Sequence, residues 1–148
     1  MSSQPDHPHV PVIPQPPMTR DALREAVKRL DLARIAEFDR ELGEAFDRAV
    51  QTASTTPMRL FLEKWATVVA IERLPGRFHA MREAERVTGD PRATEEDFRS
   101  AQQTIARILR EASAEAGAAG STHGAKVSRT PSAGPGSTTP TPSGSSAA

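Results

Sequence analysis

Histidines and acidic side chains are the residues of this chain whose spacing first suggests chemistry. His7 and His9 lie two positions apart with one carboxylate beside them, Asp6, and His79 and Glu83 lie four apart, as two metal ligands on one helix face would. A transition-metal site needs three or four converging ligands. Because neither pair has enough partners, we predict that the chain has no metal site.

No pattern in the chain is typical of an enzyme active site. No serine lies in a nucleophile elbow, and no glycine-rich loop joins a strand to a helix. Asp39, Glu41 and Glu44 lie among arginines on one predicted helix, which favours salt bridges over acid–base catalysis. We therefore predict a protein that is not an enzyme, with no catalytic residues and no cofactor.

Arginines form the first candidate for binding a partner. They are spread over the last two predicted helices: Arg77, Arg82, Arg86, Arg92 and Arg99. Together they can form a basic face for nucleic acid or for an acidic protein, although Glu83, Glu85 and residues 95–97 dilute the charge.

The second candidate is the apolar stripe of the last predicted helix, residues 94–116. Its candidate contact residues are Phe98, Ile105, Ile108 and Leu109. The linker of residues 89–93 makes this helix separable from the rest of the domain. It can dock into the groove of a partner, or fold back and close the bundle.

The elements that position these residues are all predicted to be helices. Starts are marked by capping residues at Thr19, Asp31 and Thr94, and by a Thr N-cap before Pro57. The helix from Pro57 to about residue 73 is apolar on more than one side, which is typical of a buried helix. We expect it to lie at the centre of the fold, with Trp65 in the core.

Both ends of the chain differ from this middle in composition. Residues 1–17 are rich in proline, and residues 117–148 consist mostly of Gly, Ser, Thr, Pro and Ala. Such segments have too little apolar surface to offset the entropy of ordering. The sequence thus predicts one helical domain, residues 18–116, folded as a small all-α bundle of four to five helices between two disordered tails.

Charge and hydropathy limit the classes of partner and the cellular location that we expect for the chain. Lys+Arg and Asp+Glu both number 19, so the chain lacks the basic surplus of most nucleic-acid-binding domains. The most apolar stretch, residues 65–71, is too short to span a bilayer, and the N-terminus lacks the pattern of a secretory signal. With no cysteine in the chain, we expect a cytoplasmic protein without membrane contact.

Residues 22–85 resemble an uncharacterised family of short actinobacterial proteins. The likeness lies in LREAVKRLDLARIAEFDRELGEAF (residues 23–46) and LFLEKWATVVAIE (residues 60–72), with a Thr-Pro break between them. Members of that family are often encoded beside RelE/ParE-like toxins, so the resemblance implies an antitoxin-like role. Such antitoxins often carry an acidic surplus, which this chain lacks.

These observations favour a non-enzymatic protein-interaction module, in its sharper form an antitoxin-like protein whose last helix or tail wraps a RelE/ParE-like toxin. The alternative is a DNA-binding transcriptional regulator that uses the arginine-bearing face. Assembly into a homo-oligomer stays open.

Overall fold

The computed structural model describes residues 10–124, and within this range it contains helices and no strand. This confirms the predicted all-α bundle. The elements are α1 (Arg20–Leu30), the 3₁₀ turn η1 (Leu32–Arg34), α2 (Ile35–Thr52), α3 (Thr56–Glu72), α4 (Pro75–Thr88) and α5 (Glu95–Gly124). The predicted tail segments 1–9 and 125–148 lie outside the described residues.

Local capping explains where most helices begin. The Thr19 hydroxyl accepts a hydrogen bond from the Ala22 amide, and Thr94 and Asp97 form a reciprocal capping box. α3 begins at Thr56, one residue before the predicted start at Pro57, so Thr55 is its N-cap and makes no side-chain capping bond. There, the Ser54 hydroxyl accepts from the Thr56 amide instead.

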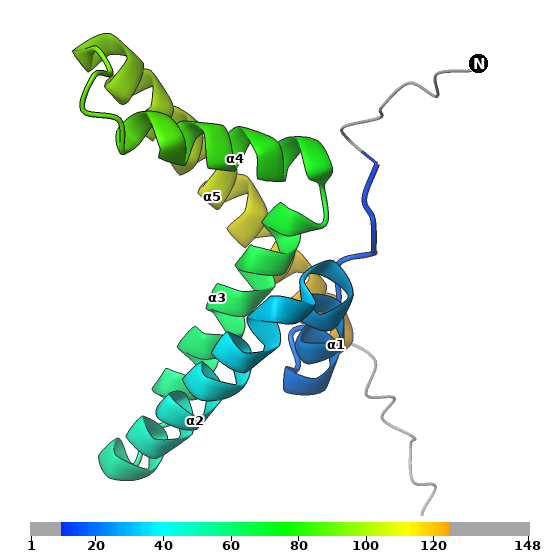
Figure 1. Ribbon diagram of the computed structural model, residues 1–148. Helices are drawn as coiled ribbons and strands as arrows, with labels where there is room; N and C mark the ends of the chain where they lie inside the picture. Colours follow the sequence, from blue (N-terminus) through cyan, green and yellow to red (C-terminus); the bar gives the residue numbers. More distant parts are fainter. Residues whose placement is uncertain (1–9, 125–148) are drawn as a thin grey trace, which may run out of the picture.

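The helices form two arms that diverge from α3, as Figure 1 shows. One arm is the antiparallel pair α2–α3, and the other is the pair α4–α5. The second half of α5 runs back across α3 towards α1. α3 belongs to the first arm and also packs against both helices of the second. It is therefore the centre of the fold, as its composition predicts.

Aromatic packing on α3 forms the main core. The rings of Phe38 and Trp65 are fully buried, and the Phe38 ring meets Phe61 and Trp65 edge-to-face with centroids 5.0 Å apart in each case. Leu23 and Val27 of α1 complete this cluster. Such edge-to-face pairs contribute beyond simple area burial, so they help to fix how α2 crosses α3.

The last helix folds back and closes the bundle. Ile108 and Ala112 of α5 pack with Ala70 and Ile71 of α3 in a second core cluster. The helix continues to Gly124, beyond the expected end at residue 116. Its C-terminal part lies against Met18: a Cβ on Gly120 would be in ordinary contact with the Met18 Cβ, at 3.5 Å. Tertiary contacts here outweigh the low helix propensity of glycine.

Residues 10–17 lie against the domain, whereas the sequence predicts a disordered arm up to residue 17. The Val12 amide donates to the Arg73 carbonyl (2.7 Å), and the Gln15 side chain donates to the Ala66 carbonyl (3.2 Å). Ile13 packs on the main core. The Arg73 carbonyl lies at the C-terminal end of α3 and has no partner within the helix, so the hydrogen bond from Val12 satisfies it. Residues 10–17 therefore make both polar and apolar contacts with the domain.

An ion-pair cluster holds α5 to the end of α3 and the start of α4. Arg73 and Arg77 both donate to the Glu115 carboxylate, and Arg77 does so through two nitrogens at 2.7 and 3.0 Å. The hydrogen bond from Arg77 is the largest cause of a lowered Glu115 pKa, and Arg73 adds to it against the opposing effect of burial. The carboxylate is thus held in its charged form.

Replacing this carboxylate should make stability depend less on pH. Glu115→Gln should cost about 1–3 kcal/mol near neutral pH, because two arginine side chains that are 14% exposed lose their charged partner. Since the pKa of Glu115 lies below its ordinary 4.5, its stabilisation is present above that value and is lost as the pH falls through the lowered pKa. Urea denaturation at about pH 7 and about pH 3 measures both effects.

The matched control is Glu111→Gln, because Glu111 is 47% exposed and lies 3.9 Å from Arg77. It should change stability much less. An equal loss for both variants, or a loss for Glu115→Gln that persists in acid, would contradict the assignment.

Candidate functional site: a groove between α3, α4 and α5

A groove of about 700 Å³ lies where the two arms meet. Its lining comes from α3 (Leu60, Glu63, Lys64, Thr67, Val68, Ile71, Glu72), α4 (Phe78, Met81, Arg82, Glu85), α5 (Leu109, Ser113) and the segment before α2 (Asp31, Arg34). Three of its apolar side chains are well exposed: Leu60 by 55%, Leu109 by 40% and Phe78 by 37%. Apolar groups from three helices therefore meet on one solvent-facing surface.

The groove exists because α3 is apolar on more sides than its neighbours cover. Phe61, Trp65 and Val69 belong to the main core, and Ala70 packs with α5. The side of α3 that carries Leu60 faces the groove. The sequence predicts a buried helix that is apolar on more than one side, and the structure shows that one of its apolar sides is open.

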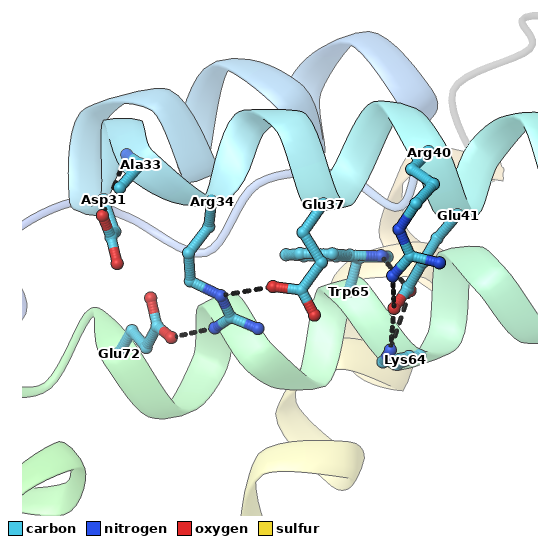
Figure 2. A network of polar contacts seen from close by, with 9 residues as sticks. All are labelled: Asp31, Ala33, Arg34, Glu37, Arg40, Glu41, Lys64, Trp65 and Glu72. Atoms are coloured by element: carbon cyan, nitrogen blue, oxygen red, sulfur yellow. Dashed lines mark hydrogen bonds and ion pairs between the residues drawn. The ribbon is translucent and has the colours of Figure 1, made fainter.

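A polar network borders the groove on the α2 side (Figure 2). Arg34 bridges the carboxylates of Glu37 and Glu72, and its guanidinium lies 5.0 Å from the centroid of the Trp65 ring. Glu41 accepts hydrogen bonds from Lys64 at 2.6 Å and from the Trp65 indole at 3.0 Å. These contacts join α2 to α3 beside the groove, and Arg34, Lys64 and Glu72 line it directly.

Two carboxylates in this network have pKa values shifted in opposite directions. Burial is the largest influence on Glu72 and raises its pKa, with the charge of Arg34 opposing it. Burial also opposes the charge on Glu41, but the hydrogen bonds from Lys64 and Trp65 outweigh it and lower that pKa. Two causes make the difference: Glu72 is more deeply buried and lies near the negative charge of Asp31, whereas Glu41 receives two hydrogen bonds at close range.

The groove unites only two of the side chains that the sequence singles out. Leu109 lines it, and Arg82 lies at its edge with its guanidinium 5.6 Å from the centroid of the Phe78 ring. Phe98 is 39% exposed near the start of α5, and Ile105 is half-buried on the same helix. Neither lines the groove.

Ile108 is 2% exposed within the second core cluster. Contact between Ile108 and a partner therefore does not fit this conformation. The sequence pattern missed this distinction because Ile108 and Leu109 are adjacent and both apolar. Only the packing of α5 on α3 decides which of them faces inward.

The arginines of the predicted basic face are largely paired with acids. Arg77 binds Glu115, Arg82 binds Glu85, Arg86 binds Glu83 and Arg99 binds Glu95. Each of these four arginines thus has an acidic partner that offsets its positive charge locally.

The two side-chain pairs that could suggest a metal site are His79 with Glu83, on α4, and His7 with His9. Glu83 accepts hydrogen bonds from Arg86, whose side chain is the largest cause of the lowered Glu83 pKa. His79 and Glu83 line a separate cleft between α4 and α5. Within residues 10–124, no group of three or more His, Cys, Asp or Glu side chains is placed to hold a metal ion. His7 and His9 lie outside the described residues.

Leu60, Val68, Phe78 and Met81 are groove residues that sequence reasoning did not select. One signal pointed to Leu60 and Val68, namely the apolar character of α3 on more than one side, whereas Phe78 and Met81 belong to α4. That signal predicted burial, because the sequence does not show how many neighbouring helices will cover α3.

Comparison with known proteins places the sequence in a family. Residues 7–118 match the profile described as a family of unknown function, DUF6247. The chain belongs to the DUF6247 family. The matched part of this DUF6247 chain includes every groove residue. No curated protein and no solved structure matches the chain.

Among the helices of the described residues, none is both long enough and apolar enough to cross a membrane. The longest, α5, has charged residues on its first turn and along its length.

The fluorescence of Trp65, the sole tryptophan of the chain, should report the protonation of the two carboxylates whose pKa values are shifted. Its fluorescence should change once above pH 4.5, when Glu72 is protonated and its pair with Arg34 loosens, and again below pH 4.5, when Glu41 is protonated. Glu72→Gln should remove the upper step, and Glu41→Gln the lower one. The pH-dependent emission of the folded protein is the measurement.

The two steps also differ in their effect on stability. The raised pKa of Glu72 favours folding at acid pH, a contribution lost as the pH rises through that value. The lowered pKa of Glu41 favours folding above its ordinary value of 4.5, a contribution lost as the pH falls through the lowered pKa. A single step in the Trp65 fluorescence, unchanged in both variants, would contradict the assignment of the two steps to Glu72 and Glu41.

Proposed function

We propose that this protein is a non-enzymatic protein-interaction module, and that its groove binds an amphipathic helix of a protein partner. One observation carries the proposal: Leu60, Phe78 and Leu109 come from three different helices, each is more than a third exposed, and all three line the same groove. Exposed apolar surface gathered in one place is typical of an interaction site.

The dimensions and lining of the groove suit a helix. Along α3 it extends from Leu60 to Glu72, which corresponds to about 18 Å at the helical rise per residue. About three turns of a partner helix fit this length and present anchors at positions i, i+4 and i+7.

Charged residues of both signs surround the apolar part of the groove. Lys64 and Arg82 are accompanied by Glu63 and Glu85. Charges around an apolar contact contribute mainly to orientation and partner choice. We therefore expect a partner helix with charges of both signs beside its apolar stripe.

In its finer form the proposal is an antitoxin-like protein of the cytoplasm whose partner is a RelE/ParE-like toxin. The support is the resemblance of residues 23–46 and 60–72 to short actinobacterial proteins often encoded beside such toxins. The folded-back α5 favours a toxin helix seated in the groove over a last helix that wraps the toxin. A wrapping role for the C-terminal tail concerns residues outside the described range.

Co-expression with the product of the adjacent gene, followed by pull-down and a growth assay, tests the proposal. We expect a stable complex and suppression of toxicity. Leu109→Glu should weaken the complex at least about tenfold, because it places a charge on the apolar surface of the groove. The dissociation constant measured by calorimetry reports the effect.

Phe98→Glu is the matched control, since Phe98 lies on the same helix with 39% exposure, against 40% for Leu109, and does not line the groove. It should leave the affinity unchanged. Equal losses for the two variants, or no complex at all, would overturn the proposal. Binding to duplex DNA with a steep salt dependence would support the DNA-binding alternative instead.

A further inference from the structure

Residues 10–18 and the end of α5 lie against each other, although they come from opposite ends of the described range. A Cβ added at Gly120 would be in ordinary contact with Met18, 3.5 Å from its Cβ. Ile13 and Met18 pack on the main core cluster, to which Ala116 of α5 also belongs. In Figure 1 the last turns of α5 run towards the start of α1, where residues 10–18 end. The two terminal segments thus share one part of the core.

Arg73 connects the same two segments through different atoms. Its carbonyl accepts a hydrogen bond from the Val12 amide at 2.7 Å, and its Nη2 donates to Glu115 of α5 at 2.9 Å. Moving residues 10–18 away would remove the partner of the Arg73 carbonyl and the contact with Gly120 together. The hold on the C-terminal part of α5 therefore depends on the N-terminal segment.

The docked arrangement leaves two polar atoms unsatisfied at this junction. Within residues 10–124, Gln15 Oε1 and Arg73 Nε are buried without a hydrogen-bonding partner. Such atoms bind water once they are exposed, so opening removes a penalty. The end of α5 adds to this, because its residues Gly117, Gly120 and Gly124 favour a helix only weakly. Docked and released states are therefore closer in free energy here than in the aromatic core between α2 and α3.

Proline makes the docking of this segment reversible at a small entropic cost. Residues 10–18 contain Pro11, Pro14, Pro16 and Pro17. Each proline fixes its own φ and favours an extended conformation in the preceding residue. A released segment of this composition stays extended, so it loses less conformational entropy on docking than a freely flexible chain. It can therefore leave the domain and return while the helices stay folded.

We propose that residues 10–18 are a latch on α5: when docked they hold its C-terminal part against α3, and when released they free it. Leu109 and Ser113, which line the groove, lie within about two helical turns of Glu115. Release of the latch thus loosens the α5 wall of the groove and lowers the affinity for a partner helix. This consequence rests on the proposed function, whereas the latch itself does not.

Hydrogen exchange of the full chain without a partner tests the latch through Val12→Pro. This change deletes the amide that binds Arg73, and the Val12 side chain is 63% exposed, so the ring has space at the surface. The amides of α5 from Ser113 onwards should exchange at least about tenfold faster, because the latch is open more often. The amides of Phe38 and Phe61, in the aromatic core, should exchange at the wild-type rate.

Val10→Pro is the matched control. Val10 is 58% exposed, and its amide makes no hydrogen bond to another described residue. This variant should leave exchange in α5 unchanged. Equal acceleration by the two variants, no acceleration by Val12→Pro, or the same acceleration in every helix would overturn the latch.

Gly120→Ala and Gly117→Ala test the same coupling from the side of α5. Both changes favour the helix to a similar extent. Only Gly120→Ala adds a contact with the latch, because its Cβ would lie 3.5 Å from the Met18 Cβ, whereas a Cβ at Gly117 would meet nothing within 4 Å. Gly120→Ala should therefore slow the exchange of the Val12 amide several-fold more than Gly117→Ala does. An equal response of the Val12 amide to both variants would contradict the latch.

Calorimetry with the product of the adjacent gene tests the consequence for the groove. Val12→Pro should bind this partner at least about threefold more weakly than the wild type, because groove and latch are coupled, and Val10→Pro should bind it as the wild type does. A wild type that binds no partner would refute the proposed function, while the exchange rates still decide the latch. Equal affinities of the wild type and Val12→Pro would refute the link between latch and groove.

Discussion

The burial of α3 is the constraint on which the rest of this structure depends. This helix carries apolar side chains on several sides, and the chain must cover them with only four other helices in the described range. The aromatic contacts of Phe38 with Phe61 and Trp65 bind α2 to one side. Ile108 and Ala112 bring α5 to another. The side that carries Leu60 receives no such cover and becomes the floor of the groove.

Charged residues mark the border between the covered and uncovered parts of α3. Arg34 and Lys64 both lie over the Trp65 ring, and Glu41 accepts hydrogen bonds from Lys64 and the Trp65 indole. At the other end of α3, Arg73 and Arg77 meet on Glu115. Partly buried ion pairs of this kind contribute little net stability but are costly to break singly. They hold the helices in one arrangement and so preserve the shape of the groove.

Two apolar surfaces with different surroundings follow from this arrangement. The groove is concave, is lined by three helices and is bordered by charges of both signs. The exposed side chains of Phe46 and Val50 lie on α2, outside the lining of the groove, and near them a Cβ added at Gly43 would meet nothing within 4 Å. A concave site lined by apolar groups suits a partner's helix.

Much of the fold can be read from the sequence, because helix signals are local. The periodicity of apolar residues, Thr19 and the Thr94–Asp97 capping box predict the helices to within a few residues, and the composition of α3 predicts its central place. Where the end of a segment depends on contacts with residues distant in sequence, the sequence predicted it less well. Residues 10–17 are ordered through Arg73 and Ala66, and α5 is prolonged through residues near Gly120.

The sequence by itself determined the class of the fold, the elements and the residues able to form a core. Only the tertiary structure decided that Ile108 faces inward while its neighbour Leu109 faces the groove, and that Leu60 and Phe78 meet there. The physical reason is that periodicity identifies the apolar side of a helix but not what lies opposite it. Which apolar surface is buried, and which is left for another molecule, depends on how many helices pack around α3.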